Sequence, residues 1–272
     1  MSKALITQSY LTNIANSIRT KLGVQTTYTP SQMSSAIDSI PSGGDDTEFL
    51  KVLNGGASSI TLPSGTTKIK RYLFFNDTSL QTIDIPNSVA SIESKAFQGC
   101  NNLALTSLPS GVTSIWNYAF YGCTNLALTS LPSGVTSIGN YAFYGCTNLA
   151  LTSLPSGITS IEQYAFNGCQ NLALTSLPNG ITELLLHVFD GCIKLDLSNL
   201  PSGIYKIQAQ AFGMCTGLTS ITFWGKPSFM DINAFYGCTN LRTINVPWSQ
   251  YAVANAPWGA TNATINYNYT PT

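Results

Sequence analysis

The sequence predicts a repeat solenoid, a fold in which successive coils of the chain stack on one another. The first observation is a period of 23 residues that returns without insertion or deletion over eight copies. The second is that whole copies are almost identical, since residues 101–123 and 124–146 differ at only two positions. The third is composition, with an ordinary apolar content of 44% but only 9% charged residues. Together these features favour stacked coils that share one continuous core.

Four columns of equivalent residues are expected to form that core. Neighbouring strands of a sheet lie about 4.8 Å apart, so equivalent residues of successive coils should stack into ladders at about that separation. A glycine precedes the cysteine in most copies, where a tight turn needs a permissive backbone. The columns are Phe97, Phe120, Phe143, Phe166, Phe189, Phe212 and Phe235; Cys100, Cys123, Cys146, Cys169, Cys192, Cys215 and Cys238; Leu80, Leu103, Leu126, Leu149, Leu172, Leu195, Leu218 and Leu241; and Ile92, Ile115, Ile138, Ile161, Leu184, Ile207 and Met230.

The columns combine into a motif: Leu-x-x-Ile-x-Ile-Pro, then Val-x-x-Ile, then Ala-Phe-x-Gly-Cys. Residues 80–100, LQTIDIPNSVASIESKAFQGC, match it closely, and the pattern covers roughly residues 60–247. It resembles the BspA-like class of leucine-rich repeat. The resemblance implies an α/β solenoid with a parallel β-sheet and short helical or 3₁₀ turns. The middle copies read LALTSLP, for example at 103–109, where an apolar residue stands one place earlier than in LQTIDIP at 80–86. This difference leaves the strand register of the middle copies open.

Residues 1–46 do not repeat and are expected to form a helical hairpin and a linker ahead of the solenoid at 47–247. PSGGDD at 41–46 indicates a flexible joint. We expect the hairpin to serve attachment or oligomerisation; the alternative is a cap on the solenoid. The first amphipathic helix is indicated by Leu11, Ile14, Ile18, Leu22 and Gly23, and the second, with a capping box and an early proline, by Thr29, Pro30, Gln32, Met33, Ile37 and Ile40.

The last segment, residues 248–272, is expected to be a C-terminal β cap. The alternation of Ile265, Tyr267 and Tyr269 suits a final strand, and a solenoid must cover its last coil to avoid end-to-end aggregation.

Both ends of the chain carry a second resemblance. Residues 10–41 are similar to a short module of predicted tail and fibre proteins of phages and prophages of gut Gram-positive bacteria, and the C-terminal segment is similar to endings of such proteins. This resemblance implies a virion protein.

Composition argues against several classes of partner. Twelve basic and twelve acidic residues cancel, and so charge-poor a surface has no electrostatic means of binding nucleic acid. No run of 18 apolar residues occurs, so we expect no membrane insertion. The N-terminal segment lacks the unbroken apolar core of a secretory signal peptide, so export by the usual route is not expected.

No catalytic, cofactor or metal site is expected. Metal sites need clustered ligands such as Cys-x-x-Cys, which do not occur, and the seven cysteines are expected to be buried, reduced fillers rather than disulfides. His187, the only histidine, stands where other copies carry tyrosine and is expected at the surface without catalytic partners. Glu93, Glu162 and Asp231 share a column but have several coils between them, too many for a glycosidase pair.

One column varies so freely that it is expected to face solvent, and Trp116 stands in it. We favour ligand binding for Trp116, because aromatic side chains with polar tips suit binding surfaces. Tyr118 and Tyr121 should share one face of a short helical turn while Phe120 and Cys123 share the other. Packing within the framework is an equal alternative for the tyrosines. The variable column is Lys70, Glu93, Trp116, Gly139, Glu162, Leu185, Gln208 and Asp231, and the exposed aromatic strip is Trp116, Tyr118, Tyr121, Tyr141, Tyr144 and Tyr164.

The sequence therefore predicts a non-enzymatic binding protein. The main hypothesis is a phage tail or fibre-associated virion protein, made in the host cytoplasm, whose repeats recognise a bacterial surface glycan or protein receptor and whose N-terminal module contacts other virion proteins. The first alternative is a bacterial cell-surface or secreted adhesin that binds a host protein or glycan, although LPSGT at 62–66 does not satisfy the sortase pattern. The second is a structural spacer, which would have no ligand for the aromatic strip. Assembly into a homo-oligomer is left open.

Overall fold

The computed structural model describes residues 58–62 and 64–270. The chain divides after Ser58 into two compact units, and the second, Ser59–Thr272, contains the repeats and the C-terminal segment. The helical hairpin expected within residues 1–46 lies outside the described residues.

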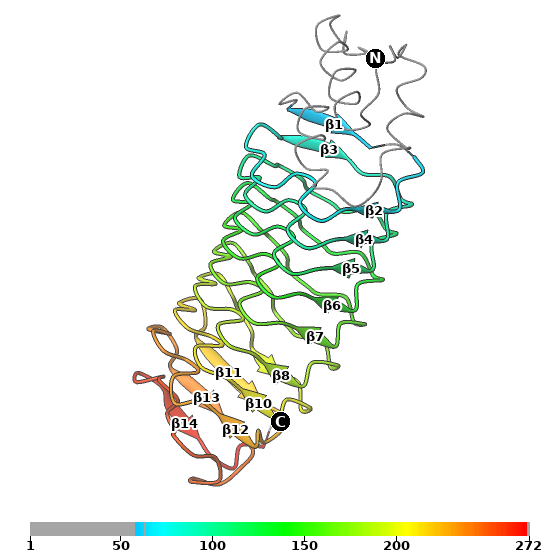
Figure 1. Ribbon diagram of the computed structural model, residues 1–272. Coiled ribbons are helices and arrows are strands. Elements are labelled where there is room, and N and C mark those ends of the chain that lie inside the picture. Colours follow the sequence, from blue (N-terminus) through cyan, green and yellow to red (C-terminus); the bar gives the residue numbers. More distant parts are fainter. Residues whose placement is uncertain (1–57, 63, 271–272) are drawn as a thin grey trace, which may run out of the picture. The chain divides into compact units, whose positions relative to one another are not determined.

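Parallel pairing of short strands gives the second unit its architecture. Within the described residues the strands are β1 (Ser59–Thr61), β2 (Lys68–Ile69), β3 (Thr82–Asp84), β4 (Ser91–Ile92), β5 (Ser114–Ile115), β6 (Ser137–Ile138), β7 (Ser160–Ile161), β8 (Glu183–Leu184), β9 (Asn199–Leu200), β10 (Lys206–Ile207), β11 (Ser220–Phe223), β12 (Phe229–Met230), β13 (Thr243–Asn245) and β14 (Thr264–Asn266). They form sheets in the orders β2-β4-β5-β6-β7, β8-β10-β12, β9-β11-β13-β14 and β1-β3. The expected parallel solenoid is confirmed (Figure 1).

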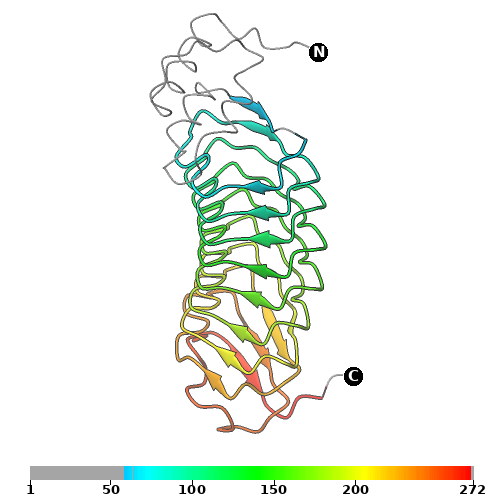
Figure 2. The ribbon, with the colours of Figure 1, turned by 45° about the vertical axis from the view of Figure 1, so that its right-hand side comes forward.

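The register of these sheets reproduces the sequence period. Ser114 of β5 pairs with Ser91 and with Ser137, one coil to either side, and Ile115 pairs with the isoleucines of the same neighbours. β2, β4 to β8, β10 and β12 therefore succeed one another along one side of the stack (Figure 2), whereas β3 pairs with β1 in a separate sheet. β14 pairs with β13, so a final strand does form near the C-terminus; it contains Ile265 of the predicted alternation but ends before Tyr267 and Tyr269.

The predicted core columns are buried ladders. The phenylalanine rings stack almost parallel, with centroids 5.1–5.9 Å apart and interplanar angles of 3–15°. Phe74, which the sequence analysis did not include, begins this ladder and is also buried. The leucine, isoleucine and cysteine columns lie in the same core.

The turns that follow the strands β4 to β7, such as residues 116–123 after β5, are not helical. This corrects the expectation of helical or 3₁₀ turns. In residues 116–123 the backbone N–H groups alternate between two kinds of partner. Ala119 N–H donates to the Trp116 carbonyl in its own coil (3.2 Å), whereas Phe120 N–H donates to Ala142 in the next coil (2.8 Å). Tyr118 has a left-handed φ of +59°, which breaks any helix. The turn thus exchanges helical hydrogen bonds for bonds that join the coils.

The open question of register in the middle copies is answered by a one-residue shift. Thr82–Asp84 form β3, but the equivalent residues 105–107 form no strand. Instead, Ala127 N–H donates to the Leu105 carbonyl at 3.0 Å, 22 residues back, and Ala150 repeats this bond to Leu128. The leucine that the sequence places one position earlier is fully buried in the central copies, as at Leu128.

Close coil-to-coil contact predicts a contrast between two glycines of one column. A Cβ at Gly111 would lie 2.0 Å from the Asn87 carbonyl oxygen, whereas at Gly157 the nearest atom, the Val135 carbonyl oxygen, is 4.0 Å away. We expect Gly111→Ala to lower the free energy of unfolding by about 1–3 kcal/mol. Gly157→Ala should stay within about 0.5 kcal/mol of the parent. Urea denaturation followed by circular dichroism tests this, and equal effects of the two substitutions would contradict it.

Candidate ligand-binding site

The outer face of β4 to β7 presents two rows of side chains. In each two-residue strand the serine lies toward solvent and the isoleucine is buried, as for Ser114 and Ile115. The residue after the isoleucine lies outward again, which places the variable column beside the serine row. Its most exposed large apolar member is Trp116, with 54% of its surface accessible.

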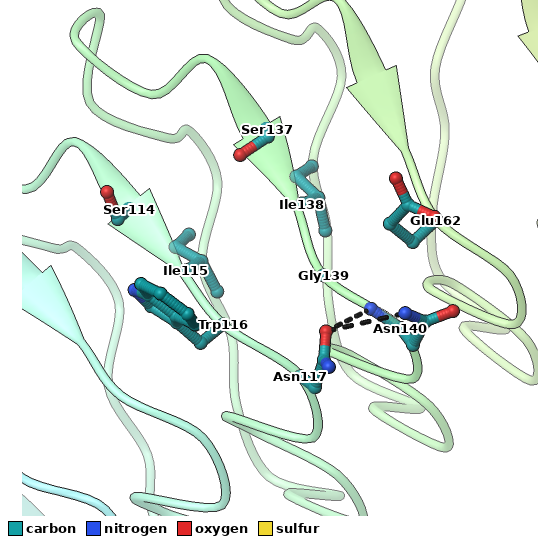
Figure 3. Close-up of a pocket in the computed structure, with 9 residues that line it drawn as sticks. All are labelled: Ser114, Ile115, Trp116, Asn117, Ser137, Ile138, Gly139, Asn140 and Glu162. Atoms are coloured by element: carbon teal, nitrogen blue, oxygen red, sulfur yellow. Dashed lines mark hydrogen bonds between the residues drawn. The ribbon is translucent and has the colours of Figure 1, made fainter.

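A pocket of about 330 Å³ opens on this face around Gly139. Trp116 and Glu162 stand on opposite sides of that glycine, each one coil away (Figure 3). We call this pocket the Trp116 slot. Its lining residues are Ser114, Ile115, Trp116, Asn117, Ser137, Ile138, Gly139, Asn140 and Glu162. Apart from the indole and two core isoleucines, the lining is composed of hydroxyl, amide and carboxylate groups and one glycine.

Gly139 is needed where it stands because Asn117 folds over it. A Cβ at this position would lie 2.6 Å from the Asn117 backbone nitrogen and 2.7 Å from Asn117 Oδ1. That Oδ1 accepts a hydrogen bond from the Asn140 N–H at 2.9 Å (Figure 3). The glycine therefore permits the link between the two asparagines, and the Asn117 amide lies where a side chain of residue 139 would begin.

Glu162 borders the slot and also a second pocket of about 220 Å³ at a break in the sheet. β7 and β8 belong to different sheets. Glu162 N–H donates to the carbonyl of Ile138 at 2.9 Å, but among the described residues Leu185 makes no equivalent bond to Ile161. The Glu162 carboxylate is held by the Ser160 hydroxyl, which donates to its Oε1 at 2.6 Å.

The predicted tyrosines lie in two stacked columns. Tyr118, Tyr141 and Tyr164 stack with centroids 4.6–4.8 Å apart, and Tyr121 stacks on Tyr144 at 4.7 Å. The columns touch each other, since Tyr118 and Tyr121 are 5.8 Å apart. All five rings are half-buried. Burial, with a contribution from neighbouring phenols, raises the pKa of Tyr121 and Tyr141.

Trp116 forms no ring contact with these tyrosines among the described aromatic pairs, so the structure divides the expected strip into two parts. The tyrosines pack on their ladder neighbours, as the framework interpretation describes. Trp116 instead lines a slot with Asn117, Gly139, Asn140 and Glu162. Sequence reasoning did not find this group, although the exchange of tryptophan for glycine between adjacent copies was the signal for it.

The repeat pattern and these ladders agree with a comparison against known families. A family model described as BspA type leucine-rich repeat region matches residues 53–152 and 136–257. The chain belongs to this family.

Solved structures of leucine-rich repeat proteins are similar to the chain. A leucine-rich cell surface protein from Faecalibacterium prausnitzii is 30% identical with a TM-score of 0.50, over 71% of this chain and 60% of that protein. A T. pallidum leucine-rich repeat protein is 27% identical with a TM-score of 0.50, over 69% of this chain and 79% of that protein. This chain therefore spans less than two thirds of the F. prausnitzii protein. No protein of curated function matches it.

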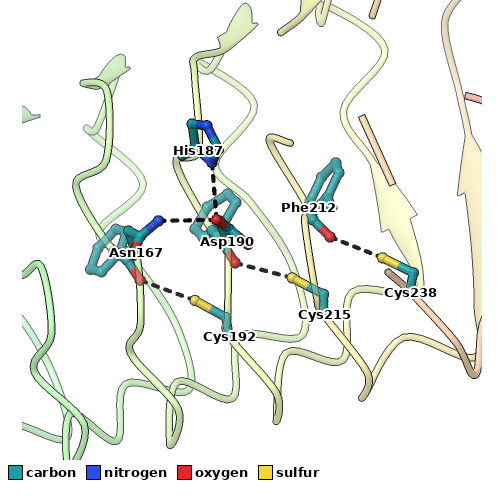
Figure 4. Close-up of polar contacts among 9 residues, drawn as sticks. Asn167, His187, Asp190, Cys192, Phe212, Cys215 and Cys238 are labelled. Carbon is teal, nitrogen blue, oxygen red and sulfur yellow. Dashed lines mark hydrogen bonds and ion pairs between the residues drawn. The ribbon is translucent and has the colours of Figure 1, made fainter. Parts of the chain in front are cut away.

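His187 extends the tyrosine column of this BspA-type solenoid, but it is half-buried rather than a free surface residue. Its ring stacks on Tyr164 at 4.8 Å, and its Nδ1 lies 2.9 Å from Asp190 Oδ2. Asn167 Nδ2 donates to the same oxygen at 3.2 Å (Figure 4). Among the described residues no hydroxyl or thiol bonds to the ring, so the His–Asp pair has no nucleophile beside it.

The seven cysteines are free and buried, as expected for packing residues. They also hydrogen-bond: each Sγ–H donates to the carbonyl of a phenylalanine 26 residues earlier, at 2.9–3.1 Å (Figure 4). Burial raises the pKa of every thiol, to about 12 for Cys100 and Cys238. A thiol with so high a pKa stays protonated and unreactive at neutral pH.

The described residues contain no group of three or more His, Cys, Asp or Glu side chains that could hold a metal ion. None of them forms a helix of the length and apolarity needed to cross a bilayer.

Proposed function

We propose that this chain is a non-enzymatic recognition protein of a bacterial cell surface, and that it binds a host glycan or protein through the Trp116 slot. The similarity to a cell surface protein at 30% identity supports the location. The observation that carries the binding role is the half-exposed indole of Trp116 in a pocket whose other lining groups around Gly139 are mainly polar. The slot's volume of about 330 Å³ falls at the small end of the range for ligand pockets, about 300–1,000 Å³.

The rest of the face supports a contact centred on Trp116. Tryptophan is among the residues that most often dominate binding energy, typically in the middle of a patch whose other contacts are nearly neutral. Ser91, Ser114, Ser137 and Ser160 give Trp116 such surroundings, a row of small uncharged groups.

Substitution of two tryptophans tests this proposal. We expect Trp116→Ala to weaken binding of the labelled protein to cultured epithelial cells by at least about tenfold, a loss of about 1.4 kcal/mol. Trp224→Ala is the matched control, because Trp224 is 49% exposed but lines a different pocket. Flow cytometry measures binding, and circular dichroism checks the fold. Equal binding of the parent and Trp116→Ala, or equal loss in both variants, would overturn the proposal.

Location is tested separately, because a phage tail protein remains the competing proposal. The resemblance that favours it rests on residues 10–41, outside the described residues, and on the C-terminal ending. Quantitative mass spectrometry of washed cell envelopes and purified phage particles from the producing strain separates the two. Enrichment on envelopes supports the surface protein, whereas a fixed stoichiometry in particles supports the virion protein.

A further inference from the structure

We propose that the Trp116 slot binds one uncharged pyranose ring of a glycan, seated over Gly139 between the indole and the Glu162 carboxylate. The inference rests on the proposed recognition function and narrows its ligand to one chemical class. Three features carry it: a single aromatic wall, polar groups with unused hydrogen-bonding capacity, and a glycine in the coil between Trp116 and Glu162.

The single aromatic wall distinguishes a sugar site from a cation site. A pyranose ring has apolar C–H groups that pack on an aromatic side chain and hydroxyls around its rim. Sites for quaternary ammonium or methylated lysine instead enclose the cation with several aromatic faces. Trp116 is the only aromatic residue of the slot lining. One carboxylate opposite one indole therefore fits a ring with hydroxyls better than a free cation.

The polar lining has hydrogen-bonding capacity that the fold does not use. Glu162 Oε1 accepts from Ser160, but Oε2 has no partner among the described residues. The side-chain hydroxyls of Ser114 and Ser137 likewise make no hydrogen bond within that part of the chain, and Asn140 Nδ2 makes only a long contact of 3.5 Å to Asn117. Hydroxyls of a sugar can donate to Oε2 and can exchange hydrogen bonds with the serines and the amide.

The spacing of the coils suits a ligand one ring thick. Trp116 and Glu162 are two coils apart, and strands stack at about 4.8 Å, so their backbones stand about 9–10 Å apart. Gly139 adds no side chain to this space, and Asn117 Oδ1 lies over the position that its Cβ would take. A pyranose ring in van der Waals contact with the indole lies about 3.5–4.0 Å from it. The hydroxyls on the other face of the ring are then within hydrogen-bonding distance of the Glu162 carboxylate.

The charge of the site predicts which sugars are rejected. Glu162 carries the only charge of the slot lining. A sugar carboxylate placed beside Oε2 would meet like-charge repulsion in a partly desolvated site. We therefore expect neutral hexoses or N-acetylhexosamines to bind and uronic or sialic acids to be excluded.

Nuclear magnetic resonance of the full chain tests the inference directly. The indole N–H signals of the four tryptophans are recorded, and that of Trp116 is assigned by its loss in Trp116→Phe. We expect a millimolar panel of methyl pyranosides of neutral hexoses and N-acetylhexosamines to shift the Trp116 signal for at least one member. The Trp224 signal should stay in place, and methyl glucuronide and methyl sialoside should have no effect. The absence of any shift across the neutral panel, or equal shifts for neutral and acidic sugars, would overturn the inference.

Two further measurements separate this inference from the proposed function. Glu162→Gln should weaken binding of the neutral sugar several-fold and remove the discrimination against glucuronide; unchanged discrimination would count against the assigned role of Glu162. On epithelial cells, binding that depends on Trp116 should be lost after periodate oxidation of surface glycans. If it instead survives periodate and is lost after protease treatment, the ligand is a protein: the sugar inference fails and the recognition function stands.

Discussion

Raising the pH from 8 to 10 is expected to lower the free energy of unfolding of the solenoid by several kcal/mol, because seven buried thiols must stay protonated in the folded state. In the unfolded chain a cysteine ionises with a pKa near 9.0, whereas in the core Cys100 and Cys238 have a pKa of about 12. Each of these two thiols contributes on the order of 1 kcal/mol over this interval, and the other five thiols, whose pKa burial also raises, act in the same direction. A loss of several kcal/mol is a large share of the stability of a typical domain.

The sign follows from proton counting. Between the unfolded and the folded pKa the folded thiol holds its proton and the unfolded thiol has lost it, so stability falls as the pH rises. The contribution is fully present below about pH 9 and is lost progressively as the pH rises toward the folded value of about 12. The cause is desolvation, since the pKa of the thiol rises on burial at all seven positions.

Urea denaturation at pH 8, 9 and 10 measures this dependence. The matched variant is Cys146→Ala with Cys169→Ala, which removes two thiols from adjacent central coils. The double variant will be less stable at every pH because of the cavities, but the slope of its stability against pH should be smaller by about two sevenths. Ionisation of Lys and Tyr affects parent and variant alike. An unchanged slope in the double variant, or a flat profile in the parent, would show that the thiols do not control alkaline stability.

The core of this fold could be predicted from sequence because stacking demands equal shapes at equal intervals. A phenylalanine that recurs every 23 residues is expected to stack in a ladder, and this ladder is observed. Phe74 was omitted because its copy has Asp77 where later copies have cysteine, so the motif is incomplete there. The strand at the C-terminus was visible from alternation alone.

The turn could not be predicted in the same way. The three-residue spacing of Tyr118 and Tyr121 predicted a helical turn. In the structure Tyr118, Tyr141 and Tyr164 all adopt a left-handed φ, which a bulky residue rarely takes. What decides the conformation is the neighbouring coil, whose carbonyl groups accept alternate N–H bonds. Such a long-range cause has no local signature in the sequence.

In the candidate site, too, the sequence predicts the column in which a residue stands but not the orientation of its side chain. Trp116 could be placed at the surface because no core position tolerates the residues of its column. The slot around Trp116 depends on Asn117 folding over Gly139. It also depends on Glu162, which stands two coils from Trp116 on the same face. These relations follow from side-chain orientation across coils, which a single copy of the repeat does not reveal.

A single substitution in the middle of the phenylalanine ladder is expected to have the largest effect of any point change considered. Phe143 is fully buried and stacks on Phe120 at 5.4 Å and on Phe166 at 5.5 Å. Phe143→Ala removes the ring and both stacking contacts and leaves a cavity, which should lower the free energy of unfolding by about 3–5 kcal/mol. Tyr144→Ala is the control in the same coil, because its half-buried ring lies outside the core; we expect a loss below about 1.5 kcal/mol.

The position of Phe143 in the stack adds a qualitative expectation. In a solenoid each coil contacts mainly its neighbours, so a weak interface in the middle uncouples the two halves. Native-state hydrogen exchange should then show protection falling most around residues 120–166, while amides near β12 and β13 keep more of theirs. Loss of protection spread evenly over all coils would mean that the stack unfolds only as a whole. In that case the ladder would transmit the defect along its entire length, and the nearest-neighbour description would be wrong for this protein.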